Sequence, residues 1–299
     1  MTRPPLDRHE LGRALSRLAG ASPADLLRMA PPAPGAPTAR RIGLTGAPGA
    51  GKSTLAGHLA LQRAHEERRL GVLAIDPSSP RSGGAILGDR IRMDELAGAA
   101  DLYIRSIGSR GTSDGLSDNL PEMLETMDAF GFDEVLLETV GVGQSEYAAR
   151  AQVDTLVLVL LPESGDVIQA MKAGIMELAD IYVVNKADLP GAQKMAVDIR
   201  RVVGLARHAE GDWKPTVLLV SSQQPDSVRA LSQEIDRHQA WLEGSRRRQA
   251  LLQERARYRL RRQIERRATQ VVAGLEADLL ERPIAQQLDE ALRRIATIA

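Results

Sequence analysis

The sequence predicts an α/β protein with a doubly wound, mostly parallel sheet, a helical C-terminal extension and a short N-terminal helical arm. Short apolar segments alternate with helical segments across the middle of the 299-residue chain, as strands joined by crossover helices do. Several are unbroken apolar runs, typical of strands covered on both faces. The expected strands are Ile42–Thr45, Val72–Ile75, Leu102–Arg105, Glu134–Glu138, Thr155–Leu160, Ile181–Val184 and Thr216–Val220.

The composition supports this class and excludes others. Apolar residues make up 43% and aromatic residues only 3%, so the core is mostly aliphatic and suits an α/β protein more than a β-sandwich. The 39 basic residues balance 39 acidic ones, which gives no global attraction to nucleic acid or membranes. Cysteine is absent, which excludes disulfides and thiolate metal sites. Without an apolar leader or a long apolar stretch, we expect a cytoplasmic protein.

The chain divides into three expected parts. Residues 1–38 form an N-terminal arm and linker, with one short amphipathic helix around Leu11–Leu18 and a proline-rich stretch after it. Residues 39–224 form the sheet domain, and residues 225–299 form a helical extension. Its expected helices are Ser227–Leu242, Ser245–Arg267 and two shorter ones around Pro283.

A phosphate-binding loop follows the first strand. The segment GAPGAGKST fits G-x-x-x-x-G-K-[ST] and has a strand before it and a helical segment after it. Glycines let backbone N–H groups point at phosphate oxygens, Lys52 adds a charge for the β- and γ-phosphates, and Ser53 can ligate Mg²⁺. The alternative is a chance glycine-rich turn, which the strand–loop–helix context disfavours. The residues expected to contact the nucleotide here are Gly46, Gly49, Ala50, Gly51, Lys52, Ser53 and Thr54.

A second motif predicts the base. Asn185-Lys-Ala-Asp188 stands at the end of an expected strand, where the Asp188 carboxylate can accept hydrogen bonds from guanine N1 and N2. Adenine lacks that donor pair, so GTP is predicted over ATP. The aliphatic stem of Lys186 can cover the base plane. Ser221 and Ser222 follow the last strand and are expected to add base contacts; many GTPases carry Ser-Ala here, so which residue contacts guanine O6 stays open.

Acidic strand ends predict the metal site. Glu138 ends a strand and is followed by Thr-Val-Gly141; we expect the acid near Mg²⁺ and the Gly141 N–H at a γ-phosphate. Small translational GTPases usually have D-x-x-G here, with a glutamine soon after that orients water. In this chain Gln144 lies further along, and its role stays open.

The stretch IDPSSPRSGGAILGDR adds two further aspartates. Asp76 ends the strand after the phosphate loop, at the same sheet edge as Lys52 and Glu138, and Asp89 follows a Gly/Ser/Pro-rich segment. Mg²⁺ prefers oxygen ligands, so Ser53, Asp76, Asp89 and Glu138 are the predicted metal site. The alternative is that Asp76 caps a turn with Pro77 and that Asp89 begins the helix around Arg90–Leu96.

Five motifs together resemble one family. GAPGAGKST, IDPSSPRSGGAILGDRIRM, YIRSIGSRGT, ETVGVGQSE and MKAGIMELADIYVVNKADL stand in the order found in the MeaB/ArgK/MMAA family of metallochaperone-type GTPases. The resemblance runs from about Arg41 to Pro190 and implies a Mg²⁺-dependent GTPase. Its members act as chaperones of adenosylcobalamin-dependent acyl-CoA mutases, gate cofactor delivery and protect the mutase. Methylmalonyl-CoA mutase is the default partner, and isobutyryl-, ethylmalonyl- or hydroxyisobutyryl-type mutases are alternatives.

The resemblance also implies roles for individual residues. Hydrolysis is expected to depend on Lys52, Asp76, Glu138 and Lys172. Lys172 lies in a segment that looks like the family's third switch and is the candidate for partner-stimulated catalysis; the alternative is a solvated helix residue.

Three other functions are weighed against this one. Ten arginines between Arg246 and Arg267 invite a nucleic-acid hypothesis, but a helical arm with arginines solvated or paired to acids is preferred; such a tail makes the homodimer in the resembling family. A nickel-delivering GTPase needs His or Cys clusters, whereas this chain has no cysteine and five dispersed histidines. A nucleotide-sensing scaffold with little turnover stays a third alternative, and no protein-kinase catalytic loop is present.

Overall fold

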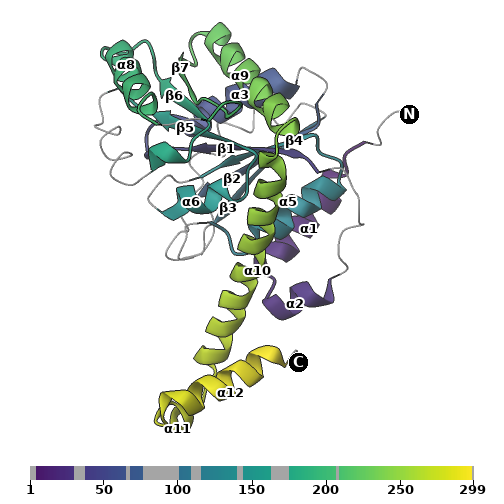
Figure 1. Cartoon of the computed structure of the whole chain (residues 1–299). Helices are drawn as coiled ribbons and strands as arrows, with labels where there is room; N and C mark the ends of the chain where they lie inside the picture. The colour runs from purple at the N-terminus through teal and green to yellow at the C-terminus, as the bar shows by residue number, and fades with distance from the viewer. Residues whose placement is uncertain are drawn as a thin grey trace.

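The computed structural model describes most of the chain and shows a single seven-stranded sheet flanked by helices (Figure 1). The strand order is β3-β2-β4-β1-β5-β6-β7, and every neighbouring pair is parallel. The predicted α/β class with a doubly wound sheet is therefore confirmed. The described residues are 5–29, 38–64, 68–76, 101–108, 116–139, 144–162, 175–206 and 209–297.

The strands lie where the apolar runs predicted them. They are β1 Arg40–Thr45, β2 Leu70–Asp76, β3 Leu102–Gly108, β4 Glu134–Glu138, β5 Thr155–Leu160, β6 Ile181–Asn185 and β7 Thr216–Val220. Three of them have the predicted bounds, and β1, β2, β3 and β6 are longer. Their extra residues are partly polar, because backbone pairing continues beyond the apolar run: Arg40 pairs with Glu134, and Ser106 with Ala74.

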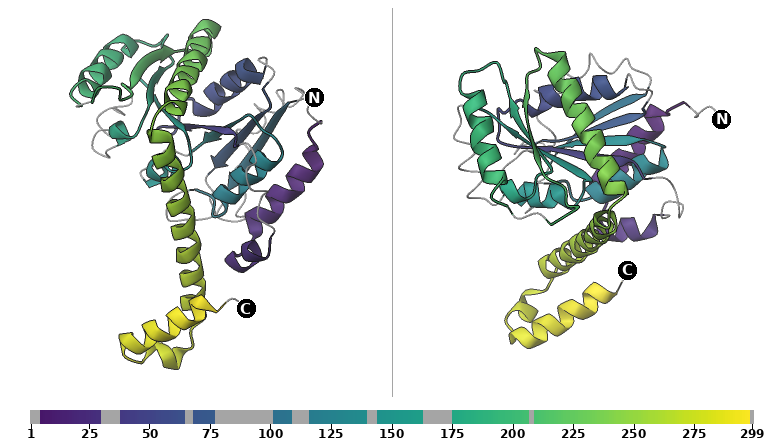
Figure 2. Two further views of the ribbon diagram at one scale, coloured as in Figure 1. Left: turned by 45° about the vertical axis from the view of Figure 1, so that its right-hand side comes forward. Right: turned by 45° about the horizontal axis from the view of Figure 1, so that its top comes forward.

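Helices cover both faces of the sheet (Figure 2). The helices α3 (Lys52–Ala64) and α9 (Pro225–Glu243) pack with β1, β2, β4 and β5 in one apolar cluster. The opposite face is covered by α5 (Leu120–Ala129), α6 (Gln144–Arg150) and α8 (Ala192–Val203), with the short 3₁₀ helix η1 (Ile175–Glu177) at its margin. Because both faces are covered, the strands consist of continuous apolar residues.

The N-terminal residues form two helices rather than one. The predicted helix is α1 (Arg8–Gly20), which packs on α5 through the buried Leu11 and Leu15. The sequence analysis missed α2 (Pro23–Arg28), although its start carries a capping box in which Ser22 and Asp25 bond each other's backbone N–H. A serine followed three residues later by an acid, with proline at the first helical position, was the available signal.

The C-terminal residues form an arm that leaves the sheet body (Figures 1 and 2). It consists of α10 (Arg247–Ala273), α11 (Ala277–Leu280) and α12 (Ile284–Ala296), and α12 folds back beside the far part of α10. Arg255, Arg259 and Arg262, spaced four and three residues apart, lie on one helix face and form ion pairs with Asp154, Glu122 and Asp118. These arginines hold the arm to the body, as the prediction of arginines paired to acids requires.

None of the helices in the described part of the chain combines the length and apolar character needed to cross a bilayer.

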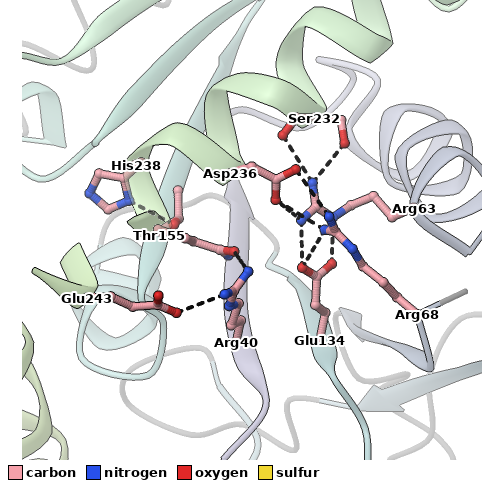
Figure 3. A network of polar contacts seen from close by, with 10 residues as sticks. Arg40, Arg63, Arg68, Glu134, Thr155, Ser232, Asp236, His238 and Glu243 are labelled. Atoms are coloured by element: carbon pink, nitrogen blue, oxygen red, sulfur yellow. Dashed lines mark hydrogen bonds and ion pairs between the residues drawn. The ribbon is translucent and has the colours of Figure 1, made fainter. Parts of the chain in front are cut away.

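A buried ion-pair cluster fastens α3 to the sheet and to α9 (Figure 3). The fully buried Arg63 donates two hydrogen bonds of 2.6 Å to Glu134 at the start of β4, and others to Ser232 and Asp236 of α9. Arg68 also pairs with Glu134, at 2.8 Å. Burial disfavours the charged guanidinium, but hydrogen bonding and attraction to Glu134 outweigh burial and raise the pKa of Arg63.

We expect Arg63→Met to lower the free energy of unfolding by about 3 kcal/mol, because it leaves the buried Glu134 carboxylate with Arg68 as its one remaining ion-pair partner in the described part of the chain. Urea unfolding measures this loss. Arg229→Met on α9 is the matched control: its pair with Asp226 is exposed, so its loss is expected below about 1 kcal/mol. Equal losses in the two variants would contradict the role of the buried cluster.

Candidate functional site

The phosphate loop runs from β1 into α3 in a conformation that requires glycine. Gly46, Gly49 and Gly51 have φ angles of 141°, 81° and 82°. A Cβ atom at Gly46 would lie 2.0 Å from the carbonyl oxygen of Val159, and one at Gly51 would lie 2.6 Å from Asn185 Nδ2. The loop therefore keeps its shape only with glycine at both positions.

The lysine of the loop lies back across the loop itself. Lys52 is 7% exposed, and its Nζ donates to the carbonyl oxygens of Gly46 at 2.8 Å and Ala47 at 3.0 Å. These contacts hold a positive charge against the carbonyl groups of the phosphate loop. Ala50, within the loop, is buried, and Thr54 lies exposed in the first turn of α3.

A hydroxyl and a carboxylate meet next to this loop. Ser53 Oγ donates to Glu138 Oε1 at 2.6 Å, and Glu138, at the carboxyl end of β4, is 7% exposed. On the neighbouring strand Ala74 pairs with Glu138, so β2 ends at Asp76 two residues beyond that rung, at the same sheet edge. The side chain of Asp76 is outside the described part. Hydroxyl and carboxylate oxygens are the ligands Mg²⁺ prefers, so the residues present fit this cation.

The base-recognition motif lies on the other side of the loop, at the end of β6. Asn185 Nδ2 donates to the carbonyl oxygen of Ala50 at 2.8 Å and so ties the motif to the phosphate loop. Lys186 has a φ of 52°, the one positive φ found for a non-glycine residue in the described ranges. Such backbone strain is typical of functional sites. The aliphatic stem of Lys186 also approaches the phosphate loop, with its Cε 3.8 Å from the position of a Cβ on Gly51.

Asp188 is held by a serine of the next strand's loop. Ser221 Oγ donates to Asp188 Oδ1 at 2.6 Å, and this hydrogen bond lowers the pKa of Asp188, so the carboxylate stays charged. Ser221 is itself fixed, because its N–H donates to Ser227 Oγ at 3.0 Å. Ser222 follows in a turn closed by the Gln224 N–H on the Ser221 carbonyl. A charged acceptor is the group that guanine N1 and N2 need.

The structure thus brings most of the predicted site to one sheet edge, and two residues there escaped the sequence analysis. Thr45, the last residue of β1, and Thr139, just after β4, are both buried, and their hydroxyl oxygens lie 3.0 Å apart. Each stands next to a recognised motif, which was the only signal. Asp89, Gly141 and Lys172 lie outside the described residues, and Gln144 begins α6 with its side chain undescribed.

A phosphate loop, an adjacent Ser–Glu pair and a fixed Asn-Lys-x-Asp motif, at the carboxyl edge of a parallel sheet, define a P-loop nucleotide-binding protein of the guanine-specific class. The profile described as "Methylmalonyl Co-A mutase-associated GTPase MeaB" matches residues 15–277. The chain belongs to this family, and the resemblance inferred from its motifs is confirmed.

Relatives and a solved structure agree with this assignment. The chain is 38% identical over 258 residues to a putative GTPase of Pyrococcus abyssi, covering 85% of this chain and 77% of that protein. It is 39% identical over 197 residues to the mouse protein "Methylmalonic aciduria type A homolog, mitochondrial", covering 65% of this chain and 48%, about half, of the mouse protein. The crystal structure of a LAO/AO transport system kinase superposes with a TM-score of 0.63 at 25% identity, covering 97% of this chain and 98% of that chain.

We expect Asp188→Asn to weaken GTP binding by at least about a hundredfold, because two hydrogen bonds to a charged acceptor are lost. Xanthosine triphosphate should gain affinity, since an amide can donate to its 2-oxo group. Competition between GTP and xanthosine triphosphate in a fluorescence binding assay measures this change in relative affinity. Asp278→Asn on the arm, an exposed aspartate, is the control. Unchanged GTP affinity in Asp188→Asn would contradict the assignment of the guanine motif.

Proposed function

We propose that this protein hydrolyses GTP with Mg²⁺ in the cytoplasm and acts as the chaperone of an adenosylcobalamin-dependent acyl-CoA mutase, gating cofactor loading and protecting the mutase. The observation that supports it most is the Ser53–Glu138 contact of 2.6 Å beside the phosphate loop and in the same sheet edge as Asp188. One edge then serves phosphate, metal and base. Membership of the MeaB family supports the mutase as partner, with methylmalonyl-CoA mutase as the first candidate.

The chemistry follows from the residues at this edge. Mg²⁺, held by Ser53 and Glu138 with Asp76 and Asp89 as further proposed ligands, would neutralise charge on the β- and γ-phosphates. Lys52 would exchange the Gly46 and Ala47 carbonyls for phosphate oxygens. The Gly141 N–H would complete the donors around the γ-phosphate. Because no arginine or glutamine is identified as a group that stabilises the transition state, we expect slow hydrolysis in the absence of a partner.

Two alternatives predict different results. A nickel-carrying GTPase needs soft or imidazole ligands in a cluster, and this chain has no cysteine; in the described ranges no group of three or more His, Asp or Glu is placed to hold a metal. A nucleotide-sensing scaffold would bind GTP with little turnover. Single-turnover hydrolysis of GTP by the protein alone separates that scaffold from an enzyme.

We expect an acyl-CoA mutase to accelerate GTP hydrolysis and Lys172→Ala to remove at least about tenfold of any such acceleration, because a lysine brought to the transferred phosphate stabilises its charge. Phosphate release with and without the mutase measures both. Lys194→Ala, at an exposed position of α8, should leave the acceleration unchanged. A rate that no acyl-CoA mutase alters would contradict the chaperone role.

A homodimer through the C-terminal arm is part of the proposal. Ile284, Leu288 and Leu292 repeat every four residues on α12 and are 76%, 57% and 56% exposed. A groove of about 830 Å³ runs between α2, α5 and α10 and meets the end of α12 at Ile295, with Leu27, Leu260 and other apolar residues in its lining. Charges of α12 are paired within the helix, as in Arg293–Asp289 and Arg294–Glu290. Paired charges of opposite sign produce little repulsion between two copies of the helix. An apolar stripe on the arm and an apolar groove between the arm and the body fit a second copy of the chain.

Leu288→Asp is expected to convert the dimer to a monomer, because it places a charge in the apolar contact. Sedimentation or light scattering at several protein concentrations measures the mass. Leu205→Asp is the control, since this leucine is 79% exposed and lies after α8, away from the arm. A wild-type mass of one chain at all concentrations would remove the dimer from the proposal.

A further inference from the structure

Thr45 and Thr139 form a hydroxyl pair in the interior of the nucleotide edge. Thr45 is 0% and Thr139 1% exposed, and Thr139 Oγ1 donates to Thr45 Oγ1 at 3.0 Å. The Thr139 N–H also donates to the Leu44 carbonyl at 3.0 Å, one step beyond the last Leu44–Glu138 rung of the ladder between β1 and β4. A side-chain contact therefore continues the strand pairing at the point where both strands end.

The two threonines stand at the beginning of two different functional segments. The residue after Thr45 is Gly46, whose carbonyl accepts from Lys52 at 2.8 Å. The residue before Thr139 is Glu138, which bonds Ser53, and the residues after it are Val140 and Gly141. The pair thus lies between the first residue of the phosphate loop and the segment expected to contact the γ-phosphate.

We infer that the Thr45–Thr139 hydrogen bond is a positioning contact that ties the segment after β4 to the phosphate loop and so sets the preference for GTP over GDP. This inference rests on the proposed GTPase function. Only GTP carries the γ-phosphate, so a contact that fixes where the segment 140–143 begins acts on GTP and leaves GDP binding unaffected. Neither threonine needs to touch the nucleotide for this effect.

The burial of both hydroxyls supports a specific rather than an incidental contact. A buried hydroxyl that loses its partner keeps the cost of desolvation, whereas replacing both partners by apolar groups of the same shape is nearly neutral. Valine has the shape of threonine without the hydroxyl. The single and double variants therefore separate stability from positioning, because stability recovers in the double variant while the side-chain link between the two segments stays absent.

The experiment compares Thr139→Val, the double variant Thr45→Val/Thr139→Val, and Thr139→Ser, which retains the hydroxyl. Affinities for Mg²⁺-GTP and GDP, single-turnover hydrolysis and thermal unfolding are measured for each. We expect Thr139→Val to lose stability and the double variant to regain it. Both should lose about threefold to tenfold of the GTP-over-GDP affinity ratio, with a lower hydrolysis rate and unchanged GDP affinity, while Thr139→Ser stays near wild type.

Thr155→Val is the matched control. Thr155 is also fully buried, with its hydroxyl 2.9 Å from His238 Nδ1, but it begins β5 at the opposite edge of the sheet. Thr155→Val should lower stability and leave the GTP-over-GDP affinity ratio unchanged. A wild-type ratio in the double variant, or an equal fall in Thr155→Val, overturns the inference alone. A wild-type protein that fails to bind GTP overturns the proposed function and this inference with it.

Discussion

The helix that carries the phosphate loop is held to one strand at both of its ends, and the site depends on this double attachment. At the start of α3, Ser53 bonds Glu138 at the carboxyl end of β4, and near its end Arg63 bonds Glu134 at the beginning of the same strand. Ten residues of helix rise about 15 Å and four residues of strand about 13 Å, so the two elements match in length. The Arg63–Glu134 pair is buried and charged, and it keeps α3 from sliding along β4.

The parallel pairing of all seven strands brings the residues of the site together. Each strand of the described sheet ends at the same edge, so polar residues at strand ends become neighbours although the chain separates them widely. Asn185 reaches Ala50 across 135 residues, and Ser53 reaches Glu138 across 85. Hydrogen bonds between the motifs fix the positions of the phosphate loop, Glu138 and the base-recognition residues relative to one another. No single motif fixes these positions alone.

Sequence patterns predicted the parts of this arrangement that are encoded locally. The apolar runs gave the seven strands within a few residues, and the nine-residue loop segment and the Asn-Lys-Ala-Asp motif each contain their own chemistry. Contacts between distant residues left no such pattern. Arg63 and Asp236 are 173 residues apart, and nothing near Arg63 in the sequence distinguishes it from a solvated arginine. Thr45 and Thr139 became a pair only once the register of β1 and β4 was known. The helix α2 was missed because its six residues are too few for apolar periodicity to show.

The attachment of α10 has a mechanical consequence. Its ion pairs to the body involve Arg255, Arg259, Arg262 and Arg266, whereas the helix continues to Ala273 and carries α11 and α12 beyond. The segment from Arg266 to Ala273 rises about 10 Å, so this part of α10 acts as a lever whose fulcrum lies beside α5. A rotation of about 10° at the fulcrum moves the end of α10 by about 2 Å at that length. Small adjustments near Asp118, just before α5, are therefore passed on to α11 and α12 at the tip of the arm.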